Sequence, residues 1–192
     1  RLGITHLDTG AMYRAVTLGI IESNIDLIDN ESISEFLKDI EIYFDSLNDI
    51  WLNGHNVAEK IRTIEVSSNV SAVSALPEVR EKMVLIQRSI AKNKHCVLEG
   101  RDIGTVVFPN ADYKFFIVAD LEIRAKRRLL DLEKIGEISS LTELISDIEN
   151  RDRLDSSRDV SPLVQAKDAI SIDTSKLTID EQIEKIIEII NN

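Results

Sequence analysis

Short segments with the pattern of β-strands alternate along this chain with helical patterns, and this order limits the possible folds more than any other feature. Strand-like runs are found at 4–8, 95–99, 113–120 and 168–175, and most of them lead into a helical pattern. Alternation of this kind is typical of α/β proteins with a mostly parallel sheet. Ligands of such sheets bind at the carboxyl ends of the strands.

A short helical pattern at 32–39, a hairpin and two further helical patterns interrupt this order and predict an inserted segment. Within it, 40–46 and 50–57 alternate apolar and polar residues and indicate a hairpin. Asn53 and Gly54 mark a further turn, after which residues 55–62 are expected to lead away. Two helical patterns follow, at 63–75 and 78–92, on either side of a proline that suits the first position of a helix.

Further local expectations concern the burial of one strand, the position of one loop and the capping of two helices. The run 113–120 is apolar throughout its middle, so we expect it to be covered on both faces. Gly104 is expected in a loop, and Thr9 or Gly10 is placed to cap the first helix. Thr178, with Glu181 three residues later, has the pattern of a capping box.

Polar residues lie at the ends of the first three strand-like runs. Asp8 ends the first run and Thr9 follows it, Arg101 and Asp102 follow the second, and Asp120 ends the third. Because the carboxyl ends of parallel strands meet at one edge, we expect these residues to face a shared ligand crevice. A structural ion pair that closes a loop is the alternative for Arg101 and Asp102.

Arg14 lies in the first turns of the helix after the first strand, next to Tyr13. The N-terminus of a helix attracts anions, so Thr9, the Gly10 backbone and Arg14 could form a phosphate site. The alternative is that Thr9 only caps the helix and Arg14 is solvated.

A second group of arginines lies on a long helical pattern at 140–159. Arg151, Asp155 and Arg158 are spaced to share one helical face. Either they form a surface salt-bridge row, or they are a movable set of arginines that closes over phosphates. The preceding helix adds further positive charge from Arg124, Lys126, Arg127 and Arg128.

The formal net charge of −11 repels nucleic acids and anionic membranes, so we expect neither as a partner. The apolar runs are too short to span a bilayer. Cys96 is the single cysteine, expected to be a buried and inert thiol, and a cytoplasmic location is expected. The histidines show no spacing typical of a zinc site.

Four stretches together resemble the bacterial cytidylate kinase family, a family of nucleoside monophosphate kinases: "LDTGAMYRAVTL", "SNVSAVSALPEVREKMVLIQR", "LEGRDIGTVVFPNADYKFFIVAD" and "RDRLDSSRDVSPL". The resemblance runs from about Leu2 to the last helix. It implies a P-loop-type α/β core at 1–25 and 93–192, an insert at 26–92 that binds the nucleoside monophosphate, and a lid near 124–158.

The resemblance also implies the reaction and its partners. The family transfers the γ-phosphate of ATP to CMP or dCMP, with Mg²⁺, and forms CDP or dCDP in pyrimidine metabolism. Small nucleotides are therefore the expected partners, and a monomer is expected. No metal ligand is assigned to this chain.

The resemblance assigns the acceptor phosphate to Thr9, Arg14 and Arg101, with Tyr13 shaping that site. It assigns the cytosine base to Ser71, Arg80 and Asp102, and the sugar to Arg151 and Asp155. Arg158 matches a lid arginine, and with Arg101 and Arg151 it makes up the expected catalytic set. Possible lid contacts to ATP are Arg124, Arg127 and Arg128. An acceptor carboxylate at Asp102 suits the C4 amine of cytosine better than the O4 of uracil.

One departure from the family concerns the phosphate loop, G-x-x-x-x-G-K-S/T. None of the seven glycines is followed by lysine. We interpret the chain as lacking an N-terminal strand and loop, and we expect the strands at 95–99 and 114–119 to lack the central strand between them. A non-catalytic nucleotide-binding protein and a kinase for UMP remain as alternatives.

Overall fold

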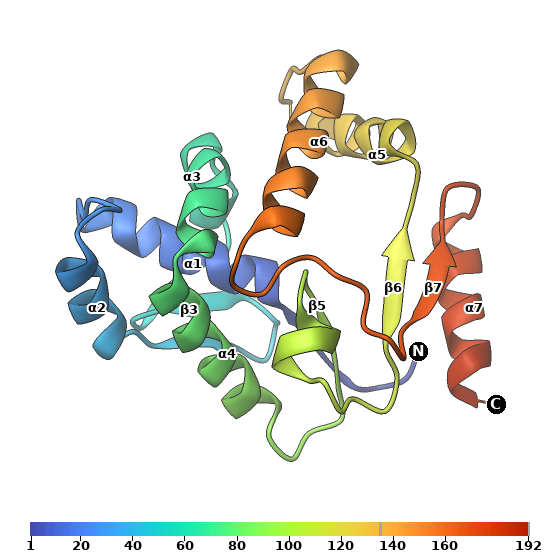
Figure 1. Cartoon of the computed structure of the whole chain (residues 1–192), viewed down its shortest axis with the longest axis horizontal. Coiled ribbons are helices and arrows are strands. Elements are labelled where there is room, and N and C mark those ends of the chain that lie inside the picture. The colour runs from blue at the N-terminus through green and yellow to red at the C-terminus, as the bar shows by residue number, and fades with distance from the viewer. Residues whose placement is uncertain (135, 192) are drawn as a thin grey trace. The chain divides into compact units, whose positions relative to one another are not determined.

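The computed structural model describes residues 1–134 and 136–191, in two compact units, Arg1–Val107 and Phe108–Asn192 (Figure 1). The first unit contains, in chain order, β1 (Thr5–Asp8), α1 (Thr9–Glu22), α2 (Asn30–Lys38), β2 (Ile42–Phe44), β3 (Ile50–Leu52), β4 (His55–Asn56), η1 (Lys60–Arg62), α3 (Ile64–Ala75), α4 (Pro77–Ala91), β5 (Cys96–Glu99) and the π-helical turn η2 (Ile103–Val107). The second contains β6 (Phe115–Val118), α5 (Leu121–Lys134), α6 (Leu141–Ser157), β7 (Ile170–Asp173) and α7 (Ile179–Asn191). The α/β class is confirmed.

The parallel strands are arranged in two pairs. In the first unit β1 pairs with β5, so that Asp8 lies opposite Glu99. In the second unit β6 pairs with β7 in the same parallel sense (Figure 1). The register of β1 and β5 brings their carboxyl ends together, and therefore places Thr9 and the segment after Glu99 at the same edge.

The core of the first unit is built around α1. Met12, Val16 and Ile20, spaced four residues apart along the helix, are almost fully buried. Gly19 allows α2 to approach, because a Cβ at this position would lie 2.5 Å from the ring of Phe36.

The cap of α1 differs from the sequence expectation. Asp8, and not Thr9 or Gly10, is the N-cap, since its carboxylate accepts a hydrogen bond from the Ala11 amide at 2.9 Å. Thr9 is already the first helical residue, so its hydroxyl is directed elsewhere and donates to the carbonyl of Glu99.

The insert contains the expected hairpin and one strand more. β2 and β3 pair antiparallel as predicted, and Pro77 lies at the first turn of α4. Asn53 and Gly54 have positive φ angles of 47° and 78°, which turn the chain back so that β4 pairs with β3. The expectation that the chain leads away after this turn is therefore wrong over His55–Asn56.

Two other local expectations are also wrong. Ile117 and Val118 of β6 are 50% and 37% exposed, because a sheet of two strands gives helices little surface to cover. Gly104 lies in η2 and not in an irregular loop. The capping box of α7 is confirmed: the Thr178 hydroxyl accepts from the Glu181 amide, and the Glu181 carboxylate accepts from the Thr178 amide.

Candidate active site

The first unit buries an ion pair between α4 and the segment after β5. Arg80 donates through Nη2 to the Asp102 carboxylate, and the two side chains are only 3% and 4% exposed. Arg80 also donates through Nη1 to the Ser74 carbonyl at 2.9 Å. A buried pair is stable only when further hydrogen bonds satisfy its groups, and the Ser74 carbonyl supplies one of them.

An aromatic ring from α1 lies against the same pair. The guanidinium carbon of Arg80 is 5.4 Å from the centre of the Tyr13 ring, within the range of a cation–π interaction. The structure thus brings together Tyr13, Arg80 and Asp102 from three separate elements. The cluster combines a carboxylate, a guanidinium and an aromatic ring, which are kinds of group that can recognise a planar heterocyclic base.

Arg14 reaches from α1 to α3. Its Nη1 donates to the Ser67 hydroxyl at 2.8 Å and to the Ile61 carbonyl at 3.3 Å. Ser71 lies one helical turn after Ser67 on α3. Sequence reasoning missed Ser67, although serines at 67, 71 and 74 recur at helical spacing and could have indicated a polar stripe on this helix.

Thr9 joins the ends of β1 and β5. Its side chain is almost fully buried, and its hydroxyl donates to the Glu99 carbonyl at 2.5 Å. Gly100 permits this approach, because a Cβ there would lie 2.5 Å from the Thr9 hydroxyl oxygen. Arg101 follows directly and is half-buried. Gly100 is a second residue that sequence reasoning did not single out. Its role is visible only from the short distance between its backbone and the Thr9 hydroxyl.

In the second unit the three residues expected on one face of α6 do meet. The buried Asp155 carboxylate lies 3.9 Å from Arg151 Nε and 3.3 Å from Arg158 Nη1. Arg158 lies just past the helix as its C-cap and also donates to the Ser161 carbonyl at 2.6 Å. The convergence of Arg158 with Arg14 and Arg101 stays a prediction, since Arg158 belongs to the other unit.

The arginines of α5 make contacts within the second unit. Arg124 pairs with Asp152 at 2.5 Å, and Arg127 donates to the hydroxyl and the carbonyl of Thr174. Arg128 is exposed. These contacts link α5 to α6 and to the end of β7, while a role toward ATP stays a prediction.

Cys96 on β5 is half-buried, less than expected, and desolvation raises the pKa of its thiol. A raised pKa keeps the thiol protonated and unreactive at neutral pH. Within residues 1–134 and 136–191 there is no group of three His, Cys, Asp or Glu side chains that could hold a metal ion. None of the described helices is long and apolar enough to cross a membrane.

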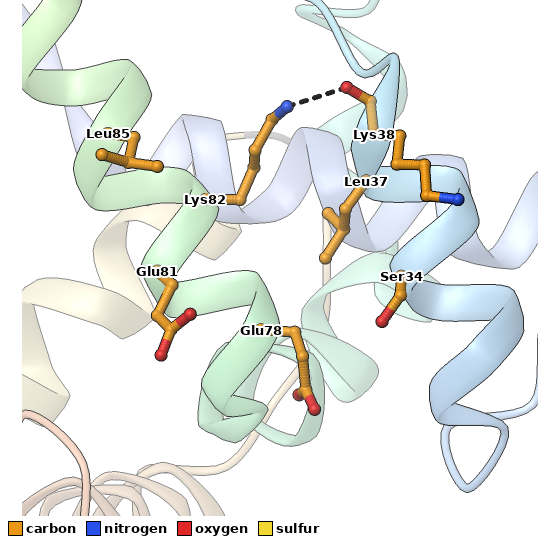
Figure 2. Close-up of a pocket in the computed structure, with 7 residues that line it drawn as sticks. All are labelled: Ser34, Leu37, Lys38, Glu78, Glu81, Lys82 and Leu85. Atoms are coloured by element: carbon orange, nitrogen blue, oxygen red, sulfur yellow. Dashed lines mark hydrogen bonds between the residues drawn. The ribbon is translucent and has the colours of Figure 1, made fainter.

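A shallow groove between α2 and α4 lies on the first unit (Figure 2). It is lined by Ser34, Leu37, Lys38, Glu78, Glu81, Lys82 and Leu85, none of which is an expected site residue. Lys82 donates across it to the Lys38 carbonyl at 3.0 Å. Two lysines, two glutamates and two leucines line its walls, so the groove offers no net positive charge to an anionic nucleotide.

Parallel strand pairs flanked by helices, with arginines and a buried Arg–Asp pair at the strand ends, define an α/β nucleotide-binding protein. Comparison with known proteins narrows this class. The model of the cytidylate kinase family matches residues 1–192.

Cytidylate kinases from several bacteria are similar along almost the whole chain. That of Clostridium botulinum strain Langeland is 47% identical over 190 residues, which cover 99% of this chain and 87% of the relative. That of Clostridioides difficile strain 630 is 46% identical over a region that covers 100% of this chain and 88% of the relative. That of Acholeplasma laidlawii is 45% identical over a region that covers 100% of this chain and 86% of the relative. The chain therefore belongs to the cytidylate kinase family and is a kinase that acts on small nucleotides.

Proposed function

We propose that the chain transfers the γ-phosphate of ATP to CMP or dCMP, and that the preassembled Tyr13–Arg80–Asp102 cluster selects the base. The observation that carries this proposal is the buried Arg80–Asp102 pair at the end of a parallel strand, in a chain of the cytidylate kinase family. The alternative of a non-catalytic binding protein is not favoured, because the similar curated proteins are named as kinases.

Base selection follows from the chemistry of the cluster. Arg80 orients the Asp102 carboxylate, whose remaining lone pairs accept the C4 amine of cytosine. In UMP the C4 oxygen is a second acceptor facing Asp102, which leaves a buried carboxylate oxygen without a donor. Ser71 on α3 supplies a hydroxyl for the same base.

The acceptor phosphate is assigned to the edge where β1 and β5 end. Arg14 and Arg101 are proposed to bind its oxygens, Thr9 to join them by exchanging its hydrogen bond to the Glu99 carbonyl for one to the phosphate, and Tyr13 to help shape the site. Arg101, Arg151 and Arg158 are proposed to neutralise the charge that develops during transfer. Asp155 holds Arg151 and Arg158 and contacts the sugar with Arg151.

The segments keep the roles that the resemblance implies. We propose that 26–92 binds the monophosphate, that 124–158 acts as the lid, and that 1–25 and 93–192 form the core. Arg124, Arg127 and Arg128 are proposed to reach ATP when the lid closes. The protein is proposed to act as a monomer.

Mg²⁺ is usual in phosphoryl transfer, where it neutralises phosphate oxygens. Among the described residues there is no group of three or more His, Cys, Asp or Glu side chains that could hold a metal ion. We therefore assign it no ligand here and derive no step through it.

The test is nucleotide binding by calorimetry, followed by turnover. The chain is expected to bind CMP and dCMP about tenfold more tightly than UMP, the scale of one buried hydrogen bond. Asp102→Asn should remove this preference, because it weakens the binding of CMP and not the binding of UMP. Turnover is measured as CDP formation from CMP with ATP. Equal affinity for CMP and UMP, or no turnover of CMP or dCMP, would contradict the proposal.

A further inference from the structure

The turn that begins at Asp102 is held by α4 at two points. Arg80 pairs with the Asp102 side chain at the start of η2. Eight residues later on α4, Arg88 donates through Nε to the Val107 carbonyl at 2.9 Å and through Nη2 to the Val106 carbonyl at 2.8 Å. Eight residues span roughly 12 Å along a helix, so α4 reaches from the first residue of the turn to its last.

The turn itself depends on one backbone acceptor. The Asp102 carbonyl accepts hydrogen bonds from the amides of Thr105, Val106 and Val107, at 3.3, 2.9 and 3.3 Å. Single π-helical turns are rare and are frequently found at functional sites. Because the three amides share one acceptor, a shift of Val106 or Val107 moves the Asp102 backbone, and with it the carboxylate.

The far end of the turn cannot continue as a helix. Pro109 has no N–H and so cannot donate to the carbonyl of Thr105, four residues before it, as a continuing α-helix would require. Arg88 supplies donors to the next two carbonyls, those of Val106 and Val107, and hydrogen bonds from a charged donor are stronger than neutral ones. The guanidinium fork suits two adjacent acceptors, which a lysine cannot match.

We infer that Arg88 is a positioning residue for base selection: it fixes the far end of η2 and so holds the Asp102 carboxylate where it meets the C4 amine of cytosine. This inference rests on the proposed function of Asp102. Arg88 acts through the backbone of the turn, and no contact between Arg88 and the nucleotide is needed.

The experiment compares Arg88→Gln, Arg88→Lys and Lys82→Gln by calorimetric titration with CMP and with UMP. Lys82 is a matched control, because it is a cation of the same helix that also donates to a backbone carbonyl, that of Lys38 in α2 (Figure 2). Arg88→Gln should weaken CMP binding about fivefold and UMP binding by less than about twofold, since it disturbs Asp102 selectively. The CMP affinity of Arg88→Lys should lie between those of the unaltered chain and Arg88→Gln. Lys82→Gln should leave the affinities for CMP and UMP unchanged.

Hydrogen exchange of the Val106 and Val107 amides provides a second readout. Their exchange should be faster in Arg88→Gln than in the unaltered chain or in Lys82→Gln. If Arg88→Gln does not fold, the same selective loss and faster exchange are required of Arg88→Lys.

The outcomes separate the two proposals. If the unaltered chain binds CMP no better than UMP, the proposed function of Asp102 fails first. If the unaltered chain prefers CMP and Arg88→Gln keeps that preference, or loses both affinities equally, only the role of Arg88 is overturned.

Discussion

At the scale of single residues, the Arg80–Asp102 pair shows how strongly burial restricts substitution. Both side chains are almost completely removed from water. Loss of one partner from a buried pair costs about 3–5 kcal/mol, because the other charge is left uncompensated. Asp102→Asn is therefore a better probe of base selection than Asp102→Ala, since the amide oxygen still accepts from Arg80.

Gln87 on α4 is a buried polar residue with no role in the proposed site. Its side chain is 1% exposed, and neither amide atom has a hydrogen-bond partner in the part of the chain that the structure describes. An unsatisfied buried amide costs about 1–3 kcal/mol. Gln87→Met, of similar volume, should therefore raise the free energy of unfolding by about 1–2 kcal/mol in urea denaturation. A decrease would show that the amide is satisfied in solution.

Gly100 is expected to tolerate no side chain. In Gly100→Ala the new Cβ would meet the Thr9 hydroxyl oxygen at 2.5 Å and Ile103 carbons at 2.9 Å. Relieving these contacts should cost about 1–3 kcal/mol of stability and weaken CMP binding through Thr9. A double-mutant cycle checks the cause: in a Thr9→Ala background the clashing oxygen is gone, so Gly100→Ala should cost less. Additive effects would contradict this explanation.

At the scale of elements, the hairpin of the insert is held by one carboxylate. Asp45 accepts hydrogen bonds from Trp51 Nε1 at 2.9 Å and from the amides of Asp49 and Leu47. Tyr43 stacks on the Trp51 ring at 5.8 Å, which supports hairpin packing as the role of this tryptophan. The hydrogen bond from Trp51, and then that from Asp49, lowers the pKa of Asp45.

The lowered pKa of Asp45 predicts an acid-sensitive hairpin. Because ionisation is favoured in the folded state, the stabilisation is present above the unfolded pKa of ~3.9 and is lost as the pH falls through the folded-state pKa. Emission of Trp51, the single tryptophan, should shift on titration from about pH 6 to about pH 2. Asp45→Asn should lack this acid-dependent component. If the pH profiles of Trp51 emission were the same in the unaltered chain and in Asp45→Asn, Asp45 would not be the source of the acid-dependent shift.

The helices follow their sequence patterns closely, whereas β4 and η2 do not. Helical periodicity, Pro77 and the capping box of α7 act within a few residues, so their positions could be predicted. β4 has only two residues and pairs because Asn53 and Gly54 reverse the chain onto β3. η2 accepts hydrogen bonds from Arg88, a residue of another helix, and no local pattern indicates this turn.

At the scale of the whole molecule, the chain forms two compact units, and the proposed functional residues are divided between them. The base-selecting cluster belongs to the first unit and the lid arginines to the second. Each group is held together by contacts within its own unit.

Nucleotide binding should stabilise the first unit measurably. At a concentration about 100-fold above its Kd, CMP should raise the free energy of unfolding by ~2.7 kcal/mol. Thermal unfolding followed through Trp51 reports this unit, and the increase in Tm should be larger with CMP than with an equal concentration of UMP. The Asp102→Asn variant serves as the control, with equal shifts expected for both nucleotides. A larger shift with UMP in the unaltered chain would contradict cytosine selection.

By itself, the amino-acid sequence determined the α/β class, most helix and strand positions and the membership in the cytidylate kinase family. These rest on periodicity, turn residues and motifs, which act over short stretches of chain. Only the tertiary structure decided that Arg80 pairs with Asp102, 22 residues away, that Arg14 reaches Ser67, and that Arg88 holds η2. The reason is physical: such contacts depend on how α1, α3 and α4 pack together, and buried polar groups take whichever partner that packing brings within reach.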